Sequence, residues 1–357
     1  MAAGGAASSA AVSRFGASQT AGVAAQSAAT PETFACDSLT VAVYGGSFGD
    51  AVRAGSITPL QETYGVSVLE DQGASTVTLG KLREQQGNPT IDIAWMDGGV
   101  SEIAQAEGLV DTIDLAALAH VNDLFPEAIH RDQDGNVFAL TGGFYAIGMA
   151  YNTDTIETPP VSWKDLWKPE YAGRVTTASP ANATWPNWFA HMAGVYGGNL
   201  DNVDPFIDAM ADLDVVAFWD AAGQADNLYQ SGEAHVGVHV AGSVWALADK
   251  GLPMAYVVPT EGAVAGDVRA HIVKGTKCKD LAMKSLELMI SPEGQRAMVD
   301  VLYLAPANTT TEISEQARER MPYGAEGTME DLIIPDWFAI NERKQQWIDL
   351  WNREVLG

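Results

Sequence analysis

The chain has 357 residues, of which 47% are hydrophobic, so it is long enough for two α/β domains with separate cores and too apolar to be disordered. Its 46 acidic and 20 basic residues give a net charge of −26, and such a chain repels phosphate backbones and anionic lipid. We therefore expect no binding to nucleic acid or to membrane surfaces, and the sequence contains no run of 18 apolar residues that would span a membrane. A surface tuned for solubility and adaptation to salty surroundings are alternative explanations of the excess of acidic residues.

The first 36 residues differ in composition from the rest, and we predict that they form an export signal and a disordered leader. Residues 1–30 are mostly Ala, Gly and Ser, with one basic residue, Arg14. The segment resembles the Ala-rich stretch of a twin-arginine export signal, although the Arg pair is missing. Small-residue patterns typical of cleavage sites end at Ala25 and Ala29. We expect a periplasmic protein with the twin-arginine route as the candidate path; a disordered tail is the alternative.

Strand and helix patterns alternate through the first third of the chain. Short β-rich runs occur at 39–44, 66–69 and 91–95. A Gly-rich turn at 45–49 follows the first run, and helical patterns then extend to about Tyr64 and cover 76–86 and 100–107. The first helix is interrupted near Pro59, and the second has Val77, Leu79 and Leu82 as its predicted inward residues. This alternation predicts a mostly parallel sheet with helices on both faces.

The later part of the chain contains a much longer strand pattern, over 138–151. Gly142 and Gly143 lie inside it, which suits a segment that passes from one domain to another. Further strands are predicted at 173–178, 215–218, 234–240, 254–258 and 267–273. Helical segments are predicted at 163–167, 188–196, 203–213, 280–290 and 337–354. The predicted buried stripe of the last helix consists of Phe338, Trp347, Leu350 and Trp351.

The segment Val161–Gly173, which reads VSWKDLWKPEYAG, resembles a signature of the spermidine/putrescine-binding branch of the family 1 extracellular solute-binding proteins. Weaker matches occur in the order that the family has, at Tyr151–Asp154, Gly232–Gly237, Ala241–Ser243, Pro259–Gly262 and Ser291–Glu293. The resemblance covers roughly residues 37–357.

The resemblance implies an α/β fold of the type II periplasmic-binding-protein class, in which two lobes close around a ligand held between them. Each lobe would be a mostly parallel sheet flanked by helices, with lobe 1 formed by 37–142 and 266–308. Lobe 2 would be formed by 143–265 and 309–357, including the C-terminal helices. The implied protein is monomeric, uses no cofactor or metal, is not an enzyme, and delivers a small-molecule ligand to ABC permease subunits in the inner membrane. A sensory binding protein that docks on a membrane receptor remains open.

Loops that follow strands supply the candidate ligand-binding residues, because ligands of open α/β sheets bind beyond the carboxyl ends of strands. The candidates in lobe 1 are Tyr44, Gly46, Ser47, Phe48 and Asp97. Those in lobe 2 are Ser179, Thr184, Trp185, Trp219, Asp220, Gln224, Ser243 and Trp245. Phe144 and Tyr145 are added from the presumed crossing.

Two kinds of side chain in this set point to an amine. The aromatic rings would stack on an alkyl chain or an ammonium group, and Asp97 and Asp220 would pair with the ammonium. Asp220 is the first choice of counter-charge, with Trp219 stacking beside it. Core packing is the alternative for the rings, and helix capping is the alternative for the aspartates.

The sequence differs from the polyamine binders that it resembles at the places that decide the ligand. The loop 178–184 has no carboxylate where those proteins carry acidic residues. Val240 stands in place of an aromatic ring, and glycines with Phe48 stand in place of Trp and Tyr in the first loop. A dication needs a carboxylate at each end. We therefore expect an amino-acid-like or 4-aminobutyrate-like solute, with a polyamine as the alternative.

Two cysteines occur, Cys36 and Cys278, which are too few for a metal cluster. In the family that the chain resembles, the strand before Cys278 runs antiparallel in the same lobe as the first strand. The resemblance therefore implies that both cysteines lie at the lower end of that lobe, where we expect a disulfide in the exported protein.

The alternative of another class is a serine hydrolase. Gly45–Gly49 fits the pattern G-x-S-x-G between a strand and a helix, with Ser47 as nucleophile and His271 as a candidate base. The elbow, however, follows the first strand of the chain, and no oxyanion segment precedes it. His235 and His239 do not predict a metal site, because residues i and i+4 of a strand lie roughly 13 Å apart.

Overall fold

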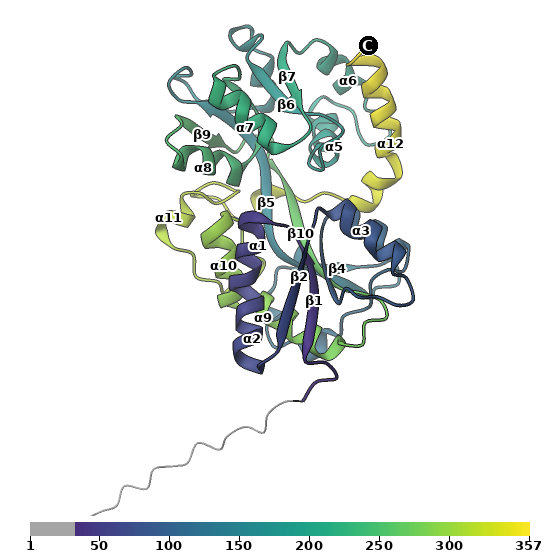
Figure 1. Cartoon of the computed structure of the whole chain (residues 1–357). Helices are drawn as coiled ribbons and strands as arrows, with labels where there is room; N and C mark the ends of the chain where they lie inside the picture. Colours follow the sequence, from purple (N-terminus) through teal and green to yellow (C-terminus); the bar gives the residue numbers. More distant parts are fainter. Residues whose placement is uncertain (1–32) are drawn as a thin grey trace, which may run out of the picture. The chain divides into compact units, whose positions relative to one another are not determined.

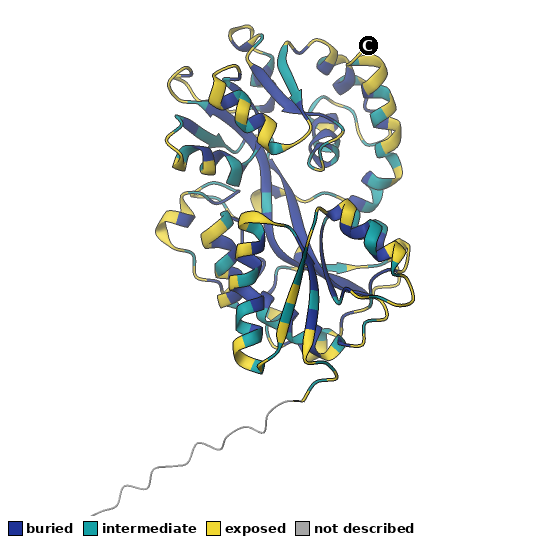
Figure 2. Ribbon diagram, in the orientation of Figure 1, coloured by how far each residue is buried: buried dark blue, intermediate teal, exposed yellow. Residues whose placement is uncertain are grey.

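Two long paired strands, β5 (Val137–Asn152) and β10 (Ala263–Ile272), lie at the centre of the computed structural model, which describes residues 33–357 (Figure 1). In the sheet order β2-β1-β3-β10-β5-β8-β6-β7 they are neighbours, and they run antiparallel. Both are buried along nearly their whole length (Figure 2). The sequence of β5 is almost entirely apolar and small, whereas β10 also buries Asp267, Arg269 and His271. The predicted leader lies, as far as residue 32, outside the described residues.

Lobe 1, as we name the elements that pack on the first hydrophobic core, lies on the β10 side of this pair. Its strands are β1 (Ser38–Val43), β2 (Ser67–Gln72), β3 (Ile93–Asp97) and β4 (Ile129–Arg131). Its helices are α1 (Gly46–Val52), α2 (Thr58–Tyr64), α3 (Ser75–Glu84), α4 (Val100–Ala106), α9 (Lys279–Ile290) and α10 (Pro292–Leu302). β1, β2 and β3 are parallel, β3 pairs antiparallel with β10, and β4 pairs with β5.

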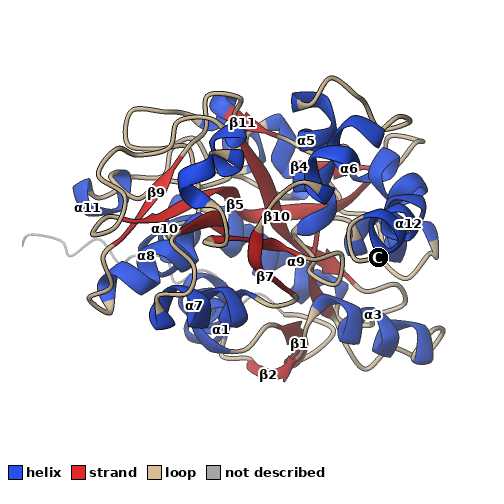
Figure 3. Ribbon diagram, turned by 90° about the horizontal axis from the view of Figure 1, so that it is seen from above, coloured by secondary structure: helices blue, strands red, loops and turns tan. Residues whose placement is uncertain are grey.

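Lobe 2, the set of elements that pack on the second core, lies on the β5 side. Its strands are β6 (Val175–Ala178), β7 (Val215–Trp219), β8 (Val236–Val240) and β9 (Met254–Val257). Its helices are α5 (Trp185–Val195), α6 (Asp204–Ala211), α7 (Ala222–Ser231), α8 (Ala241–Asp249) and α12 (Trp337–Glu354). Figure 3 shows these helices surrounding the strands when the molecule is viewed from above.

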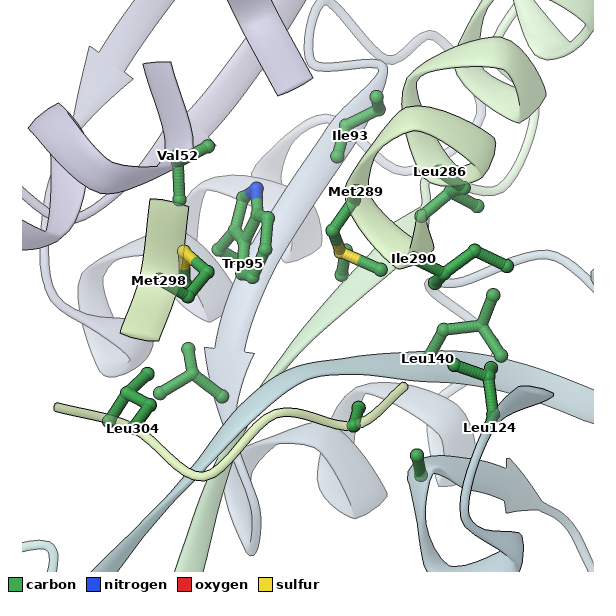
Figure 4. Packing of buried hydrophobic residues seen from close by; sticks show 14 of the residues in the cluster. Val52, Ile93, Trp95, Leu124, Leu140, Leu286, Met289, Ile290, Met298 and Leu304 are labelled. Atoms are coloured by element: carbon green, nitrogen blue, oxygen red, sulfur yellow. The ribbon is translucent and has the colours of Figure 1, made fainter. Parts of the chain in front are cut away.

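The two cores differ in chemistry. The core of lobe 1 is largely aliphatic, and Figure 4 shows Trp95 of β3 placed among Val52, Met289 and Met298 from the surrounding helices. The core of lobe 2 is aromatic: Phe189 lies 4.5 Å from Trp185 and 5.4 Å from Trp347, measured between ring centroids. These ring contacts attach α12 to lobe 2 and add to the hydrophobic stabilisation.

The segment between α10 and α12 returns along lobe 1 before it reaches lobe 2. It contains α11 (Glu315–Arg318) and the short strand β11 (Leu332–Ile333), which pairs with β10. Met329 and Leu332 belong to the core of lobe 1, whereas Trp347 belongs to the core of lobe 2. The exact division of residues between the lobes stays a prediction.

Several elements differ in detail from those expected. The helical stretch before Gly65 is continuous, because a π-helical turn at Arg53–Ile57 joins α1 to α2. In α3, Leu79 and Leu82 are buried, but the inward placement of Val77 is wrong, since it is 51% exposed. Helices α7, α8 and α10 were not predicted, because each begins directly at a strand end or a proline and has a short apolar stripe.

Cys36 and Cys278 form a disulfide with their Cα atoms 5.4 Å apart, inside the range of about 4.4–6.8 Å that a bridge requires. Cys36 precedes β1, and Cys278 is the residue before α9, so the bridge ties the start of the described fold to lobe 1. The cysteines are 242 positions apart in the sequence. A bridge across such a long loop strongly restricts the unfolded chain.

Replacing both cysteines by serine should lower the free energy of unfolding by about 2–4 kcal/mol, because the unfolded chain regains the freedom of the closed loop. Thermal unfolding of the Cys36→Ser/Cys278→Ser variant, followed by circular dichroism beside the parent protein, measures the difference. Reduction of the parent should reproduce the effect, and an unchanged melting temperature in both comparisons would contradict it.

Candidate ligand cavity

A cavity of about 520 Å³ lies between the two lobes, where strands β1, β3, β6 and β8 end. Lobe 1 contributes Ser47, Phe48 and Asp97 to its lining. Lobe 2 contributes Asn182, Ala183, Thr184, Val240, Gly242, Ser243, Ala246 and Asp249. The remaining lining residues are Tyr145, Val268, Val301, Leu302, Tyr303, Leu304 and Pro322. The position at the carboxyl ends of strands from both lobes is where an α/β sheet holds a ligand.

Asp97, the last residue of β3, is held in place by two hydroxyl groups. Its Oδ2 accepts hydrogen bonds from the Tyr44 hydroxyl at 2.7 Å and from the Ser75 hydroxyl at 2.9 Å, and these two hydroxyls also contact each other. The Asp97 backbone N–H donates to Ser75 Oγ at 2.9 Å. Among the described residues, none donates a hydrogen bond to Oδ1. The carboxylate therefore has a fixed orientation and one oxygen left for a ligand.

The charges around the cavity are few. Asp97 and Asp249 are the charged residues of the lining, which contains no Lys, Arg or His. Asp249 is already paired, because Arg320 approaches its Oδ1 at 2.7 Å. Burial raises the pKa of Asp97; the hydrogen bonds from Tyr44 and Ser75 act in the opposite direction. The cavity therefore presents one carboxylate that lacks a cationic partner.

Three helices begin at the cavity without a capping side chain. Gly46 begins α1 next to the lining residue Ser47, Thr184 precedes α5, and Gly242 and Ser243 lie in the first turn of α8. In none of the three does the residue before the helix cap it with a side-chain hydrogen bond. At α5, Trp185 N–H donates to the Asn182 carbonyl, Pro186 has no N–H, and Trp188 N–H donates to Asn187 Oδ1. Unpaired N–H groups and the positive end of a helix dipole attract an anion, which makes the start of α8 the better candidate. Two of these helix starts belong to lobe 2, opposite Asp97.

The floor of the cavity is formed where Tyr145 of β5 lies over Gly266 of β10. The two residues are directly paired in the antiparallel ladder, so they share a face of the sheet. A Cβ atom at Gly266 would lie 2.0 Å from Cζ of Tyr145, which real atoms do not tolerate. The absence of a side chain at Gly266 therefore lets the tyrosine ring lie flat and gives the cavity its depth.

The opposite face of β5 and β10 carries a buried ionic network. Arg269 Nε contacts Asp267 Oδ2 at 2.5 Å, and its Nη1 pairs with Glu102. His130 and Thr141 also contact Asp267, at 3.0 and 2.9 Å. Burial alone would raise the pKa of Asp267, but Arg269 and His130 outweigh it and hold that pKa far below its ordinary value. The network cross-links the two strands behind the cavity.

The structure brings six of the predicted site residues together on the lining: Ser47, Phe48, Asp97, Tyr145, Thr184 and Ser243. Two more lie directly behind them: Tyr44, which holds Asp97, and Gly46, which begins α1.

Seven predicted site residues lie elsewhere. Trp185 and Trp219 are buried in the aromatic core of lobe 2, and Phe144 lies on the opposite face of β5, in the core of lobe 1. Ser179 donates to Asp220 at 2.5 Å, outside the cavity, and Gln224 accepts from the Asp220 backbone N–H at 2.7 Å. Trp245 lies in a separate hollow beside Tyr256. Their expected ligand contacts are not made by the main cavity, because packing and helix geometry direct these side chains away from it.

Several lining residues were missed by sequence reasoning. Asn182 lies in the loop 178–184, which has no carboxylate, and its amide N–H donates to the Asp220 backbone carbonyl at 3.0 Å. Tyr303 and Leu304 directly follow α10 and lie beside β5, where Phe144 and Ala305 form a bridge that has no signal in the local sequence. Asp249 and Pro322 reach the cavity only through tertiary packing.

The sequence model that describes a bacterial extracellular solute-binding protein matches residues 88–326, which is more than half of the chain. The chain belongs to the bacterial extracellular solute-binding proteins. It is 27% identical over 304 residues to spermidine/putrescine-binding periplasmic protein 1 of Haemophilus influenzae, covering 82% of this chain and 80% of that protein. It is also 25% identical over 201 residues to the spermidine/putrescine-binding periplasmic protein of Salmonella typhimurium, covering 55% of this chain. That alignment spans 57% of the length of the Salmonella protein.

The fold of this solute-binding protein agrees with that of solved structures. The Atu4243 GABA receptor superposes with a TM-score of 0.74 at 20% identity, covering 89% of this chain and 97% of the other. The predicted two-lobed α/β class is thereby confirmed. No helix in the described part of the chain is both long and apolar enough to cross a membrane.

The hydrolase alternative is not supported for this solute-binding protein. His271, its candidate base, is fully buried; its Nδ1 contacts the Ala94 carbonyl at 2.9 Å and its Nε2 contacts the Ser101 hydroxyl at 2.7 Å. Both ring nitrogens are therefore engaged away from Ser47. Among residues 33–357, no group of three or more His, Cys, Asp or Glu side chains is arranged to hold a metal ion. His239 instead pairs with Asp226 at 2.9 Å inside lobe 2.

Asp97→Asn should raise the melting temperature of the ligand-free protein at pH 7. The raised pKa of Asp97 means that folding favours the protonated carboxyl, so stability falls as pH rises from 3.8 through the raised pKa. The Asn side chain removes the buried charge, and its advantage should narrow as pH is lowered toward 3.8, the ordinary pKa value. Differential scanning calorimetry from about pH 4 to pH 8 tests this.

The matched control is Asp220→Asn, an aspartate that also follows a strand but is exposed. It should show no gain in melting temperature at pH 7, because its side chain is not buried. A lower melting temperature of the Asp97→Asn variant at pH 7 would contradict the prediction. It would mean that the Asp97 carboxylate stabilises the fold of the ligand-free protein.

Proposed function

We propose that this chain captures a small solute that carries one ammonium and one carboxylate group, an amino-acid-like or 4-aminobutyrate-like compound, and delivers it to an ABC permease. The ammonium would pair with Asp97, and the carboxylate would be held by the start of α8 in lobe 2. In this role the protein acts outside the cytoplasm and performs no catalysis. The names of the curated relatives describe them as periplasmic proteins, which supports that compartment, with twin-arginine export as the proposed route.

The observation that carries the proposal is the single unmatched carboxylate of the lining. Asp97 has a free oxygen and a fixed orientation on lobe 1, whereas Asp249 is neutralised by Arg320. A second ammonium group would find no free carboxylate among the lining residues, and a desolvated cation without a partner costs several kcal/mol. The uncapped start of α8 offers the opposite polarity, which suits a carboxylate.

A polyamine remains the second candidate, because curated relatives are spermidine/putrescine-binding proteins. The structural neighbour whose name refers to GABA agrees with the first candidate, but its likeness at 20% identity extends to the fold alone. The cavity of about 520 Å³ accommodates either kind of compact solute, so charge and not size separates them.

Isothermal titration calorimetry with 4-aminobutyrate, a set of α-amino acids, putrescine and spermidine should give binding of a zwitterion and none of the diamine. Asp97→Asn should raise the dissociation constant of the zwitterion by about ten- to a hundredfold. This factor corresponds to the free energy of one hydrogen bond to a charged group. Tight binding of spermidine with no zwitterion bound would overturn the proposal.

A negative charge added at the start of α8 should change the affinities for a zwitterion and for a diamine in opposite directions. Ser243→Asp places a carboxylate beside the proposed ligand carboxylate, so zwitterion affinity should fall by about tenfold or more. The same variant would create the second counter-charge that a diamine needs, so putrescine affinity should rise. Ser243→Asn, of nearly equal size, is the control; equal effects of both variants would contradict the assignment of charges.

A further inference from the structure

Arg320 connects two parts of the cavity wall that belong to different lobes. Its Nη2 lies 2.7 Å from Asp249 Oδ1 and its Nη1 lies 2.8 Å from Asp249 Oδ2, which is a two-pronged pair. Nη1 also donates to the Tyr303 hydroxyl at 2.7 Å. The guanidinium carbon lies 4.9 Å from the ring centroid of Tyr303 and 5.7 Å from that of Trp245. This geometry combines a bidentate ion pair with two cation–π contacts.

The two partners are anchored to opposite lobes. Arg320 follows α11, whose Ala317 packs with Met321 against Val299 of α10 in lobe 1. Asp249 ends α8, whose Val244 and Leu247 lie in the core of lobe 2. Any movement that opens the cavity by separating α8 from α10 therefore pulls Asp249 away from Arg320.

Asp249 and Tyr303 both occupy unfavourable local positions, which their contacts with Arg320 stabilise. A negative charge at the last turn of a helix is unfavourable because of the helix dipole, and Asp249 is in that position on α8. Tyr303 has φ of 54°, the one left-handed non-glycine residue in the described part of the chain. Such backbone strain persists where surrounding contacts hold it, and here Arg320 holds the tyrosine ring against the cavity.

We propose that Arg320 is a positioning residue that latches the two lobes together at the wall of the ligand cavity. α8 then has two roles, because its first turn faces the ligand and its last residue holds the latch. The latch weakens with added salt, since the side chains of Arg320 and Asp249 are 20% and 48% exposed. The expected effect of the Arg320–Asp249 contact on ligand dissociation rests on the proposed function. Its expected effect on the separation of the lobes does not.

Small-angle X-ray scattering of the ligand-free full chain tests the latch without any ligand. Arg320→Gln and Asp249→Asn should each increase the radius of gyration at low salt, because more molecules occupy an open state. The parent should expand toward the same value in about 1 M NaCl, where the screening length is about 3 Å. Both variants should respond less to salt than the parent does.

The matched control is Arg296→Gln, which removes the same charge from an exposed pair with Asp300 inside α10, where no second lobe is involved. It should leave both the radius of gyration and its salt response unchanged. The double variant Arg320→Asp/Asp249→Arg restores an opposite-charge pair and should recover part of the closure. Identical scattering of the parent and both single variants, with intact circular dichroism, would overturn the proposal.

The second arm uses 4-aminobutyrate as the probe. Stopped-flow tryptophan fluorescence should give a dissociation rate about two- to tenfold faster for Arg320→Gln than for the parent, the range for a partly exposed ion pair. Failure of 4-aminobutyrate to bind the parent would count against the proposed ligand and would leave the scattering result as the test of the latch. An unchanged dissociation rate, where the probe binds, would contradict the latch.

Discussion

The structure depends on one constraint: β5 and β10 carry the chain between the lobes while buried on both faces. On one face they form the cavity floor, and on the other the Thr141 hydroxyl of β5 donates to Asp267 of β10, which is paired with Arg269. Glycines allow neighbouring rings to lie directly on the strand backbone, as Trp95 does on Gly142 and Tyr256 does on Gly148. The two crossing strands are therefore tightly packed on the cavity face and joined by polar contacts on the opposite face. The remaining strands of each lobe pair outward from them.

The sequence predicted the long or strongly patterned elements well. The last helix was predicted over 337–354 and is found at Trp337–Glu354, and the long strand predicted over 138–151 is β5. These elements have apolar patterns that extend over many residues, so local propensity and burial agree. Short helices that begin at strand ends were missed because one turn of apolar residues carries little pattern.

The cavity separates two aspartates that the sequence could not distinguish, because strand order decides which of them lies at the cavity. Asp97 and Asp220 stand in equivalent sequence positions, each at the end of a strand. β3 lies next to β10, so Asp97 faces Val268 at the cavity, whereas β7 is the last strand of the sheet and Asp220 lies at its edge. Sequence gives the ends of strands but not their neighbours, so it could not choose between the two aspartates. Trp219 was misplaced for a related reason, since the aromatic core of lobe 2 draws it inward.

The contact between Tyr145 and Gly266 also limits how such a protein changes through evolution. Any residue with a Cβ at position 266 collides with the existing ring, and a smaller residue at 145 alone leaves a void over a bare strand. A deeper or shallower pocket therefore requires two coordinated substitutions on different strands. The loop 182–184 and the first turn of α8 can vary one residue at a time. New ligand preferences are more accessible by exchanging groups at the rim than by reshaping the floor.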